Sequence, residues 1–165
     1  MKALTLTQPW ASLVALGAKQ IETRSWSTKY RGPLAIHAAK TLKEDDFYLI
    51  QMRPFLQALE SVLDLKKPLV VYGLPLGCVI ATCEITNCIK VLDKRIPEVV
   101  PVDDRIDIRL TQQFISIPPR KPEFDFGNYE PGRYAWILQN IKMLKEPIPA
   151  KGALGLWEWN EVVNG

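Results

Sequence analysis

A run of three charged side chains directly after a short apolar helix constrains this fold more than any other feature of the chain. The motif is Gly17-x-Lys19-x-x-Glu22-x-Arg24, and its neighbours are mostly apolar or β-branched. A chain usually buries such a segment, and buried charges must be paired or must line a polar site. The motif therefore predicts one of two structures, a buried ion-pair network or the wall of a polar pocket.

The helix and the strand around this motif are predicted from a proline and a glycine. Pro9 suits the first turn of a helix over residues 9–16, because proline has no backbone N–H to leave unpaired. Gly17 suits the left-handed position that ends a helix. Residues 20–26 then form a strand, in which alternate side chains share a face. One face is expected to carry Glu22, Arg24 and Trp26, and the other Lys19, Ile21 and Thr23.

The remaining pattern predicts an α+β fold. Strands are expected over residues 3–6, 33–39, 77–91, 134–141 and 154–159, and helical segments over residues 42–63, divided at Pro54. Residues 93–132 hold six prolines and are expected to form a long loop, with one helical turn near residues 110–114, after a connector over residues 69–75. Widely spaced strands with helices between them indicate a small β-barrel with flanking helices, in a single domain over residues 1–165.

Composition excludes several classes of protein. The net charge of +3 is mildly basic and its lysines and arginines are scattered, so a nucleic-acid partner is permitted but not required. No apolar run is long enough to span a membrane and no leader pattern is present, so a cytoplasmic protein without membrane contact is expected. Cys78, Cys83 and Cys88 lack metal-ligand spacing and have only His37 to join them, which favours buried reduced thiols over a metal site. Nothing in the sequence requires a cofactor or indicates an oligomeric state.

Several blocks of sequence follow one another in a fixed order along the chain. They are Gln8-Pro9-Trp10 with the Gly17-to-Arg24 motif, Ile36-His37-Ala38-Ala39-Lys40, the strand from Gly77 to Val91, Gly127-x-Tyr129-x-Pro131-Gly132-Arg133-Tyr134-Ala135-Trp136, and Gly152-Ala153-Leu154-Gly155-Leu156-Trp157. Together they resemble the ASCH domain (activating signal cointegrator homology), a family similar to the PUA-type RNA-binding barrels. The resemblance implies a barrel of five or six strands with a cleft lined by the first motif.

The resemblance also implies a ligand. ASCH proteins are mostly expected to bind RNA or nucleotides, so one base or modified nucleoside is expected in the cleft. In this hypothesis Glu22 accepts hydrogen bonds from a base edge, Arg24 holds Glu22 or contacts the ligand, and a tryptophan stacks on the base. The candidate binding residues are Gln8, Trp10, Lys19, Glu22, Arg24, Trp26, His37, Tyr129 and Arg133.

An enzyme and a protein-interaction module are the alternatives. One bacterial branch of the family hydrolyses the acetyl amide of N4-acetylcytidine with a lysine, a threonine and a glutamate. The resemblance places these at Lys19, Glu22 and Glu84, so a carboxylate stands where that branch has its threonine nucleophile. Carboxylate attack on an amide would give an anhydride, so in a hydrolase, whether amidohydrolase or ribonuclease, Glu22 would act as a general base on water and Lys19 would stabilise the oxyanion. The sequence leaves open whether the chain is an enzyme.

Each candidate residue also has an ordinary structural interpretation. His37 is most simply a half-buried strand residue that bonds to backbone, and Glu84 is equally an exposed strand residue. Trp10 is slightly favoured as a core residue, while Arg133 suits either a phosphate or a neighbouring carboxylate. The other tryptophans, at positions 136, 157 and 159, are expected in the barrel core and at its rim.

Overall fold

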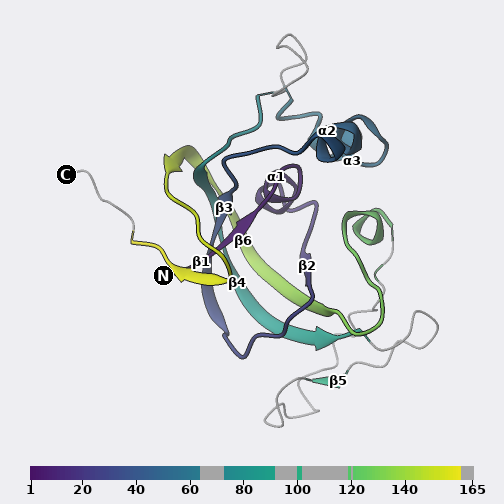
Figure 1. Cartoon of the computed structure of the whole chain (residues 1–165), viewed down its shortest axis with the longest axis vertical. Coiled ribbons are helices and arrows are strands. Elements are labelled where there is room, and N and C mark those ends of the chain that lie inside the picture. Colours follow the sequence, from purple (N-terminus) through teal and green to yellow (C-terminus); the bar gives the residue numbers. More distant parts are fainter. Residues whose placement is uncertain (64–72, 92–99, 102–118, 120, 161–165) are drawn as a thin grey trace. The chain divides into compact units, whose positions relative to one another are not determined.

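The described part of the chain combines a seven-stranded sheet with three short α-helices and one 3-10 turn (Figure 1). The computed structural model describes residues 1–63, 73–91, 100–101, 119 and 121–160. The elements are β1 (Lys2–Leu6), α1 (Trp10–Ala15), β2 (Ile21–Arg24), β3 (Gly32–Ala38), α2 (Glu44–Gln51), α3 (Phe55–Leu59), β4 (Cys78–Lys90), β5 (Val100–Pro101), η2 (Glu123–Phe126), β6 (Tyr134–Pro149) and β7 (Leu156–Glu158).

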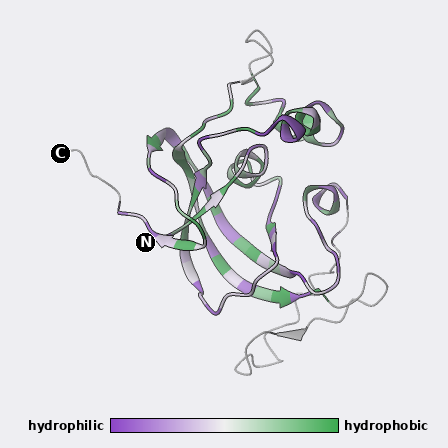
Figure 2. Cartoon of the chain, in the orientation of Figure 1, coloured by the Kyte–Doolittle hydropathy of each residue, from purple (hydrophilic) through white to green (hydrophobic). Residues whose placement is uncertain are grey.

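Strand pairing confirms the predicted α+β fold, a small barrel-type sheet with flanking helices. Hydrogen-bonded neighbours follow the order β2-β6-β4-β3-β1-β7, and β5 pairs with β4. β1 runs parallel to β3 and antiparallel to β7. The two long strands, β4 and β6, show bands of hydrophobic and hydrophilic residues, as expected for strands with one buried face (Figure 2).

By its internal contacts the chain divides into two compact units, which we call unit 1 and unit 2. Unit 1 comprises Met1–Ala18, Pro33–Glu84 and Asn140–Gly165, and unit 2 comprises Lys19–Gly32 and Ile85–Gln139. β4 and β6 each contribute residues to both units. The expectation of a single domain stays a prediction.

Unit 1 is organised around the first strand. Ala3 on β1 lies opposite Ala35 on β3 and Trp157 on β7. Ala3, Ala35, Val79 and Trp159 form a buried cluster. Burying such apolar surface stabilises the fold by roughly 25 cal/mol per Å².

The helices of unit 1 lie within the predicted ranges but are shorter, since residues 10–15 are helical within 9–16, and residues 44–51 and 55–59 within 42–63. Leu13 donates its N–H to the carbonyl of Pro9 at 3.0 Å, and Gly17 takes a φ of +73° just after the helix. Pro54 divides α2 from α3, as expected for a residue that cannot continue the first helix. No helix in the described ranges is long and apolar enough to cross a membrane.

Unit 2 is organised around the antiparallel pair β2 and β6. Ile21 lies opposite Ile137, Glu22 opposite Trp136, and Arg24 opposite Tyr134. The apolar face of this pair packs in a buried cluster of Ile21, Ile89, Val91, Tyr129, Ala135 and Ile137, with Phe124 against it. The opposite face of β2 carries Glu22 and Arg24, which places them at the start of the candidate site.

Several boundaries differ from the prediction. β6 continues to Pro149 instead of ending near residue 141, β2 covers only residues 21–24, β7 covers only residues 156–158, and the proline-rich stretch contains η2 and β5. β2 pairs only with residues 134–137 of β6, and a strand tolerates prolines such as Pro147 and Pro149 along an unpaired edge. The helical turn predicted at 110–114 and most of the 69–75 connector lie outside the described residues.

The three cysteines lie on β4, where they are free and, as predicted, buried. Burial raises the pKa of Cys83 to about 12, and the neighbouring Glu84 carboxylate adds to that effect. A thiol with so high a pKa stays protonated at neutral pH and is a weak nucleophile.

Candidate functional site

Four charged residues gather at the start of β2, and we call Lys19, Glu22, Arg24 and Glu123 the charged cluster. Lys19 is 0% exposed, and its Nζ donates to the carbonyl of Ile21 and lies 3.7 Å from Glu22 Oε2. The other carboxylate oxygen of Glu22 pairs with Arg24 Nε at 3.0 Å. The predicted ion-pair network is therefore present.

Lys19 lies on a different side of the motif from the one predicted. Simple alternation places it opposite Glu22, but Lys19 precedes the first residue of β2, so strand alternation does not fix its direction. Its long side chain reaches the Glu22 carboxylate instead. Glu22 and Arg24 share one face of β2, as predicted.

Glu123 is a member of the cluster that the sequence did not reveal. Its carboxylate accepts the backbone N–H of Gln20 at 2.7 Å and that of Ile21 at 3.1 Å. Both bonds span about a hundred residues, and Glu123 stands in a proline-rich stretch without periodicity, so no local signal could have indicated it. By holding these two N–H groups, Glu123 fixes the start of β2.

Burial and neighbouring charges shift the pKa values of Lys19, Glu123 and Tyr129. Burial lowers the pKa of Lys19, and the charges of Glu22 and Glu123 oppose that effect. Burial raises the pKa of Glu123, and its bonds to backbone N–H groups together with the Lys19 charge oppose it. Burial also raises the pKa of Tyr129, with Glu123 and Glu22 adding to the shift, so that phenol stays neutral.

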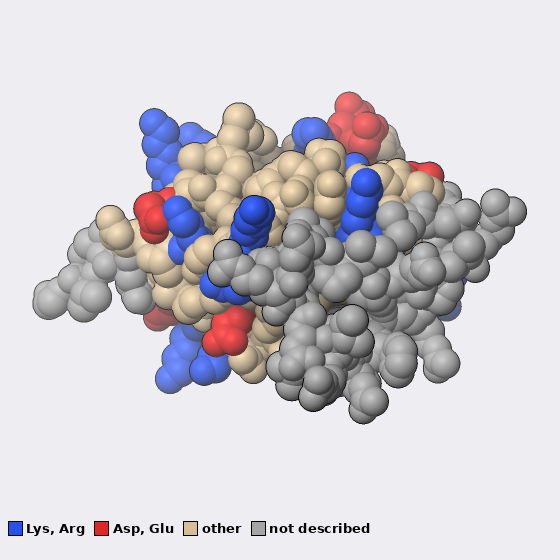
Figure 3. Space-filling view, turned by 90° about the horizontal axis from the view of Figure 1, so that it is seen from below, with Lys and Arg blue, Asp and Glu red and all other residues tan. Residues whose placement is uncertain are grey.

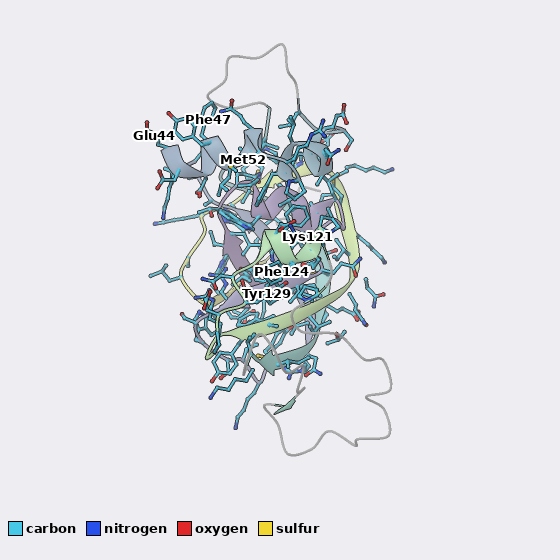
Figure 4. The ribbon with its side chains drawn as sticks, turned by 90° about the vertical axis from the view of Figure 1, so that its right-hand side faces the viewer. Glu44, Phe47, Met52, Lys121, Phe124 and Tyr129 are labelled. Atoms are coloured by element: carbon cyan, nitrogen blue, oxygen red, sulfur yellow. The ribbon has the colours of Figure 1, made fainter. Side chains whose placement is uncertain are left out.

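The backbone at Gly127 packs directly against the ring of Tyr129, which explains the glycine in the motif Gly127-x-Tyr129. Its ring stacks on Phe124, with centroids 5.6 Å apart and planes at 16° (Figure 4). A Cβ on residue 127 would lie 2.7 Å from Tyr129 Cε2, closer than atoms can approach. Tyr129 is 3% exposed and belongs to the apolar cluster of unit 2, beside the charged cluster.

Arg133 ties the same segment to β2. Its Nε donates to the carbonyl of Asn128 at 3.1 Å, and its Nη2 donates to the carbonyl of Thr23 at 3.3 Å. Asn128 in turn donates its N–H to Thr23 Oγ1 at 3.0 Å. The guanidinium therefore binds two main-chain oxygens and positions the segment next to β2.

Trp26 lies two residues beyond Arg24 in the chain and is half-buried. Its ring meets Trp136 edge to face, with centroids 4.6 Å apart, and its carbonyl accepts the Trp136 indole N–H at 3.3 Å. Trp136 is fully buried and lies opposite Glu22 across the strand pair. Arg24, with 26% of its side chain exposed, and Trp26 are both partly exposed.

The other candidates belong to unit 1. Gln8 is fully buried, and its Oε1 accepts the N–H of Ser12 at 3.1 Å while its Nε2 donates to Pro75 O at 2.8 Å. This amide satisfies one of the unpaired N–H groups in the first turn of α1. Trp10 is half-buried and meets Phe55 of α3 edge to face at 6.4 Å.

His37 and Glu84 also have local structural partners within unit 1. His37 is 2% exposed, more deeply buried than predicted, and its Nε2 donates to Ala150 O at 3.0 Å. Burial lowers its pKa, so the ring is neutral at pH 7. Glu84 is half-exposed on β4 and accepts a hydrogen bond from Asn140 Nδ2 at 2.9 Å. Glu84 therefore has the ordinary strand surroundings that one of its two interpretations expects.

Surface charge does not single out a site. Where Figure 3 draws described residues, lysine and arginine side chains form separate groups with acidic side chains among them. Within the described ranges, no three His, Cys, Asp or Glu side chains are grouped in a way that could hold a metal ion.

Comparison with known proteins gives one family. The model of a family described as "ASCH domain" matches residues 4–148 of the chain. Activating signal cointegrator 1 of Homo sapiens is 32% identical over 103 residues, and that of Mus musculus is 31% identical over 103 residues. The aligned part is 61% of this chain but only 17% of each relative's length.

Proposed function

Because this chain belongs to the ASCH-domain family, we propose that it binds RNA through the partly exposed residues that border the charged cluster. One observation carries the proposal. Lys19 and Glu22 are almost wholly buried, whereas Arg24, bound to Glu22 at 3.0 Å, keeps 26% of its side chain exposed. The cluster thus presents one oriented guanidinium to solvent.

An oriented arginine suits RNA for a geometric reason. The ion pair with Glu22, whose Oε1 lies 3.0 Å from Arg24 Nε, holds the guanidinium near the carboxylate before any ligand arrives. A guanidinium held there can donate to a phosphate or to the acceptor edge of a base. The half-buried indole of Trp26 supplies an apolar ring on the same border, and unpaired bases stack on such rings.

In this proposal Glu22 positions Arg24 and does not itself accept hydrogen bonds from a base. Its carboxylate has Arg24 on one oxygen and Lys19 near the other. Glu123 fixes the start of β2, because its carboxylate accepts the backbone N–H groups of Gln20 and Ile21. Buried carboxylates that hold an arginine in place are a common way to preorganise a binding group.

The test compares two arginines that differ in surroundings. Arg24→Gln removes the oriented guanidinium, while Arg53→Gln removes an exposed arginine of unit 1 with the same change in charge. Fluorescence anisotropy with a labelled single-stranded RNA should show about tenfold weaker binding for Arg24→Gln, as for a lost charge-assisted hydrogen bond, and little change for Arg53→Gln. Equal affinities of the two variants would contradict the proposal.

A hydrolase is the second candidate, and one observation favours it. Lys19 Nζ lies 3.7 Å from Glu22 Oε2, so the group that would stabilise the oxyanion and the group that would act as general base are side by side. Incubation of the wild-type chain with N4-acetylcytidine, or with single-stranded RNA, tests this directly. Release of cytidine and acetate, or of cleaved RNA, that is lost in Glu22→Gln would support an enzyme, and no product would exclude both reactions.

A protein-interaction module is the third candidate. Its support is the name of the two relatives, activating signal cointegrator 1, of which this chain matches a small part. A wild-type chain that binds no RNA and turns over neither substrate would favour this role over the other two.

A further inference from the structure

Unit 1 contains a pocket that none of the candidate residues from the ASCH motif lines. Its volume is about 410 Å³, within the range of roughly 300–1,000 Å³ that small-molecule sites occupy. Residues 148–151, at the end of β6 and just after it, line it together with Trp157, Trp159 and Asn160. We propose that this pocket binds one nucleotide, with the base against the tryptophans and the phosphate on Lys151.

The aromatic wall of the pocket is held in place before a ligand binds. The indole N–H of Trp157 donates to Thr5 Oγ1 at 3.1 Å, and its ring meets His37 edge to face at 5.7 Å. Trp159 is 5% exposed and packs in the core of unit 1, and its backbone N–H donates to Met1 O at 2.8 Å. Rings that are already ordered lose little conformational entropy on binding, which favours affinity.

Two polar side chains complete the lining. Lys151 and Asn160 are both exposed at the pocket, so an ammonium and an amide are available beside the aromatic surface. Asn160 can donate to and accept from a base edge, whereas Lys151 can only donate and carries a charge. The pocket therefore offers one cation, one two-way hydrogen-bonding group and a flat apolar surface.

The charge around the pocket favours an anion. Of the residues that line it, Lys151 is the one that carries a charge. Glu158 is paired with Lys2 at 2.6 Å, so its charge is largely compensated. Of the common ligands, an inorganic anion would not use the indoles and a neutral aromatic ring would not use Lys151. A nucleotide uses both.

This inference extends the proposed function, because it places a second nucleotide site in the unit that does not contain Arg24. The two sites can be tested separately. Adenosine monophosphate, adenosine and inorganic phosphate are titrated into the intact chain, and the indole N–H signals are followed by NMR after assignment with the Trp157→Phe variant. Adenosine monophosphate should shift the Trp157 and Trp159 signals at a lower concentration than either adenosine or inorganic phosphate does.

Two exposed lysines provide the matched control. Lys151→Gln should weaken binding of adenosine monophosphate about fivefold and leave adenosine unaffected, because only the phosphate contact is lost. Lys90→Gln, which removes an exposed lysine at the end of β4, should change neither. Trp157→Phe keeps a ring and should bind, whereas Trp157→Leu should bind about tenfold more weakly. Equal effects of Lys151→Gln and Lys90→Gln, or no shift of the Trp157 and Trp159 signals, would overturn the inference.

A single-stranded oligoadenylate separates this inference from the proposed function. If Arg24→Gln weakens its binding while adenosine monophosphate leaves the Trp157 signal unchanged, the proposed function stands and the second site is wrong. If adenosine monophosphate binds at Trp157 and Arg24→Gln has no effect on the oligoadenylate, the second site stands and the Arg24 site is wrong.

Discussion

Unit 2 buries an ion pair, whereas the buried polar side chains of unit 1 are the neutral Gln8, Ser12 and His37 and the carboxyl group of Asp46. In unit 2 the Lys19 ammonium lies against the Glu22 carboxylate. In unit 1 His37 is buried with a lowered pKa, and a backbone carbonyl accepts its Nε2–H. Removing one member of a buried ion pair leaves the other charge unpaired in the interior. Removing a buried neutral ring costs the protein only the packing of that ring and one hydrogen bond. The two units should therefore respond very differently to single substitutions.

A shared feature makes the comparison sharper. Each unit packs a glycine directly on a ring, Gly127 on Tyr129 and Gly152 on His37. A Cβ on Gly152 would lie 2.5 Å from His37 Cε1, and a Cβ on Gly127 would lie 2.7 Å from Tyr129 Cε2. In both units close backbone approach explains the glycine of an ASCH motif block, so the feature that distinguishes unit 2 is its buried ion pair.

The largest effect is expected for Glu22→Ala. This change leaves the buried Lys19 ammonium without its nearest carboxylate, and breaking a buried pair costs about 3–5 kcal/mol of unfolding free energy. Urea denaturation measures the loss. The control is Glu158→Ala, which breaks the exposed pair with Lys2 and should leave the denaturation midpoint unchanged. Similar midpoints for both variants would show that the Lys19–Glu22 pair adds little to stability.

Overpacking in unit 1 is expected to cost less. Gly152→Ala forces a Cβ against the His37 ring and should lower the unfolding free energy by about 1–3 kcal/mol. Ala153→Ser, at the exposed neighbouring position, should fall within about 0.5 kcal/mol of wild type in the same assay. A stable Gly152→Ala variant would mean that His37 can move aside at little cost.

Loss of the Glu123 carboxylate should have a smaller effect. Glu123→Ala removes the acceptor for two backbone N–H groups, but Gln20 is exposed and water can replace one of the bonds. We expect a loss of about 1–2 kcal/mol, together with faster hydrogen exchange at the Gln20 and Ile21 amides. Unchanged exchange at these two amides would show that Glu123 does not hold the start of β2.

The smallest effect is a pH dependence carried by His37, the one histidine of the chain. Because burial lowers its pKa below the ordinary value of 6.5, the unfolded chain takes up a proton below pH 6.5 that the folded chain does not. Its contribution to stability is therefore complete above pH 6.5 and is lost as the pH falls below that value. Thermal melts from pH 7.5 to pH 5.5 should show a decline for wild type that is weaker in His37→Gln, and parallel curves would exclude this role.

The sequence indicates local structure better than long-range contacts. Pro9, Gly17 and Pro54 act within a turn or two of themselves, so the ends of α1 and the break between α2 and α3 were predictable. The extension of β6 was not, because Pro147 and Pro149 normally argue against a strand. Alternation of Leu144 and Ile148, which pack toward the core, was the weaker signal for it.

In the candidate site, too, the local features were predictable and the long-range contacts were not. The Glu22–Arg24 face follows from strand alternation and was predicted, but the direction of Lys19 depends on where β2 begins, a boundary that sequence rarely determines. Glu123 joins the site only through tertiary structure, since its two bonds cross about a hundred residues. The motif therefore locates the charged cluster, while the fold adds the carboxylate that positions it.

The affinity of a single-stranded RNA for Arg24→Gln, compared with Arg53→Gln, tests the central claim most directly. The claim is that the buried Glu22 carboxylate orients a partly exposed Arg24 for ligand binding. We expect Arg24→Gln to bind the RNA about tenfold more weakly than wild type. Arg53→Gln should keep both the melting temperature and the RNA affinity of wild type. Wild-type affinity in a folded Arg24→Gln variant would contradict the account.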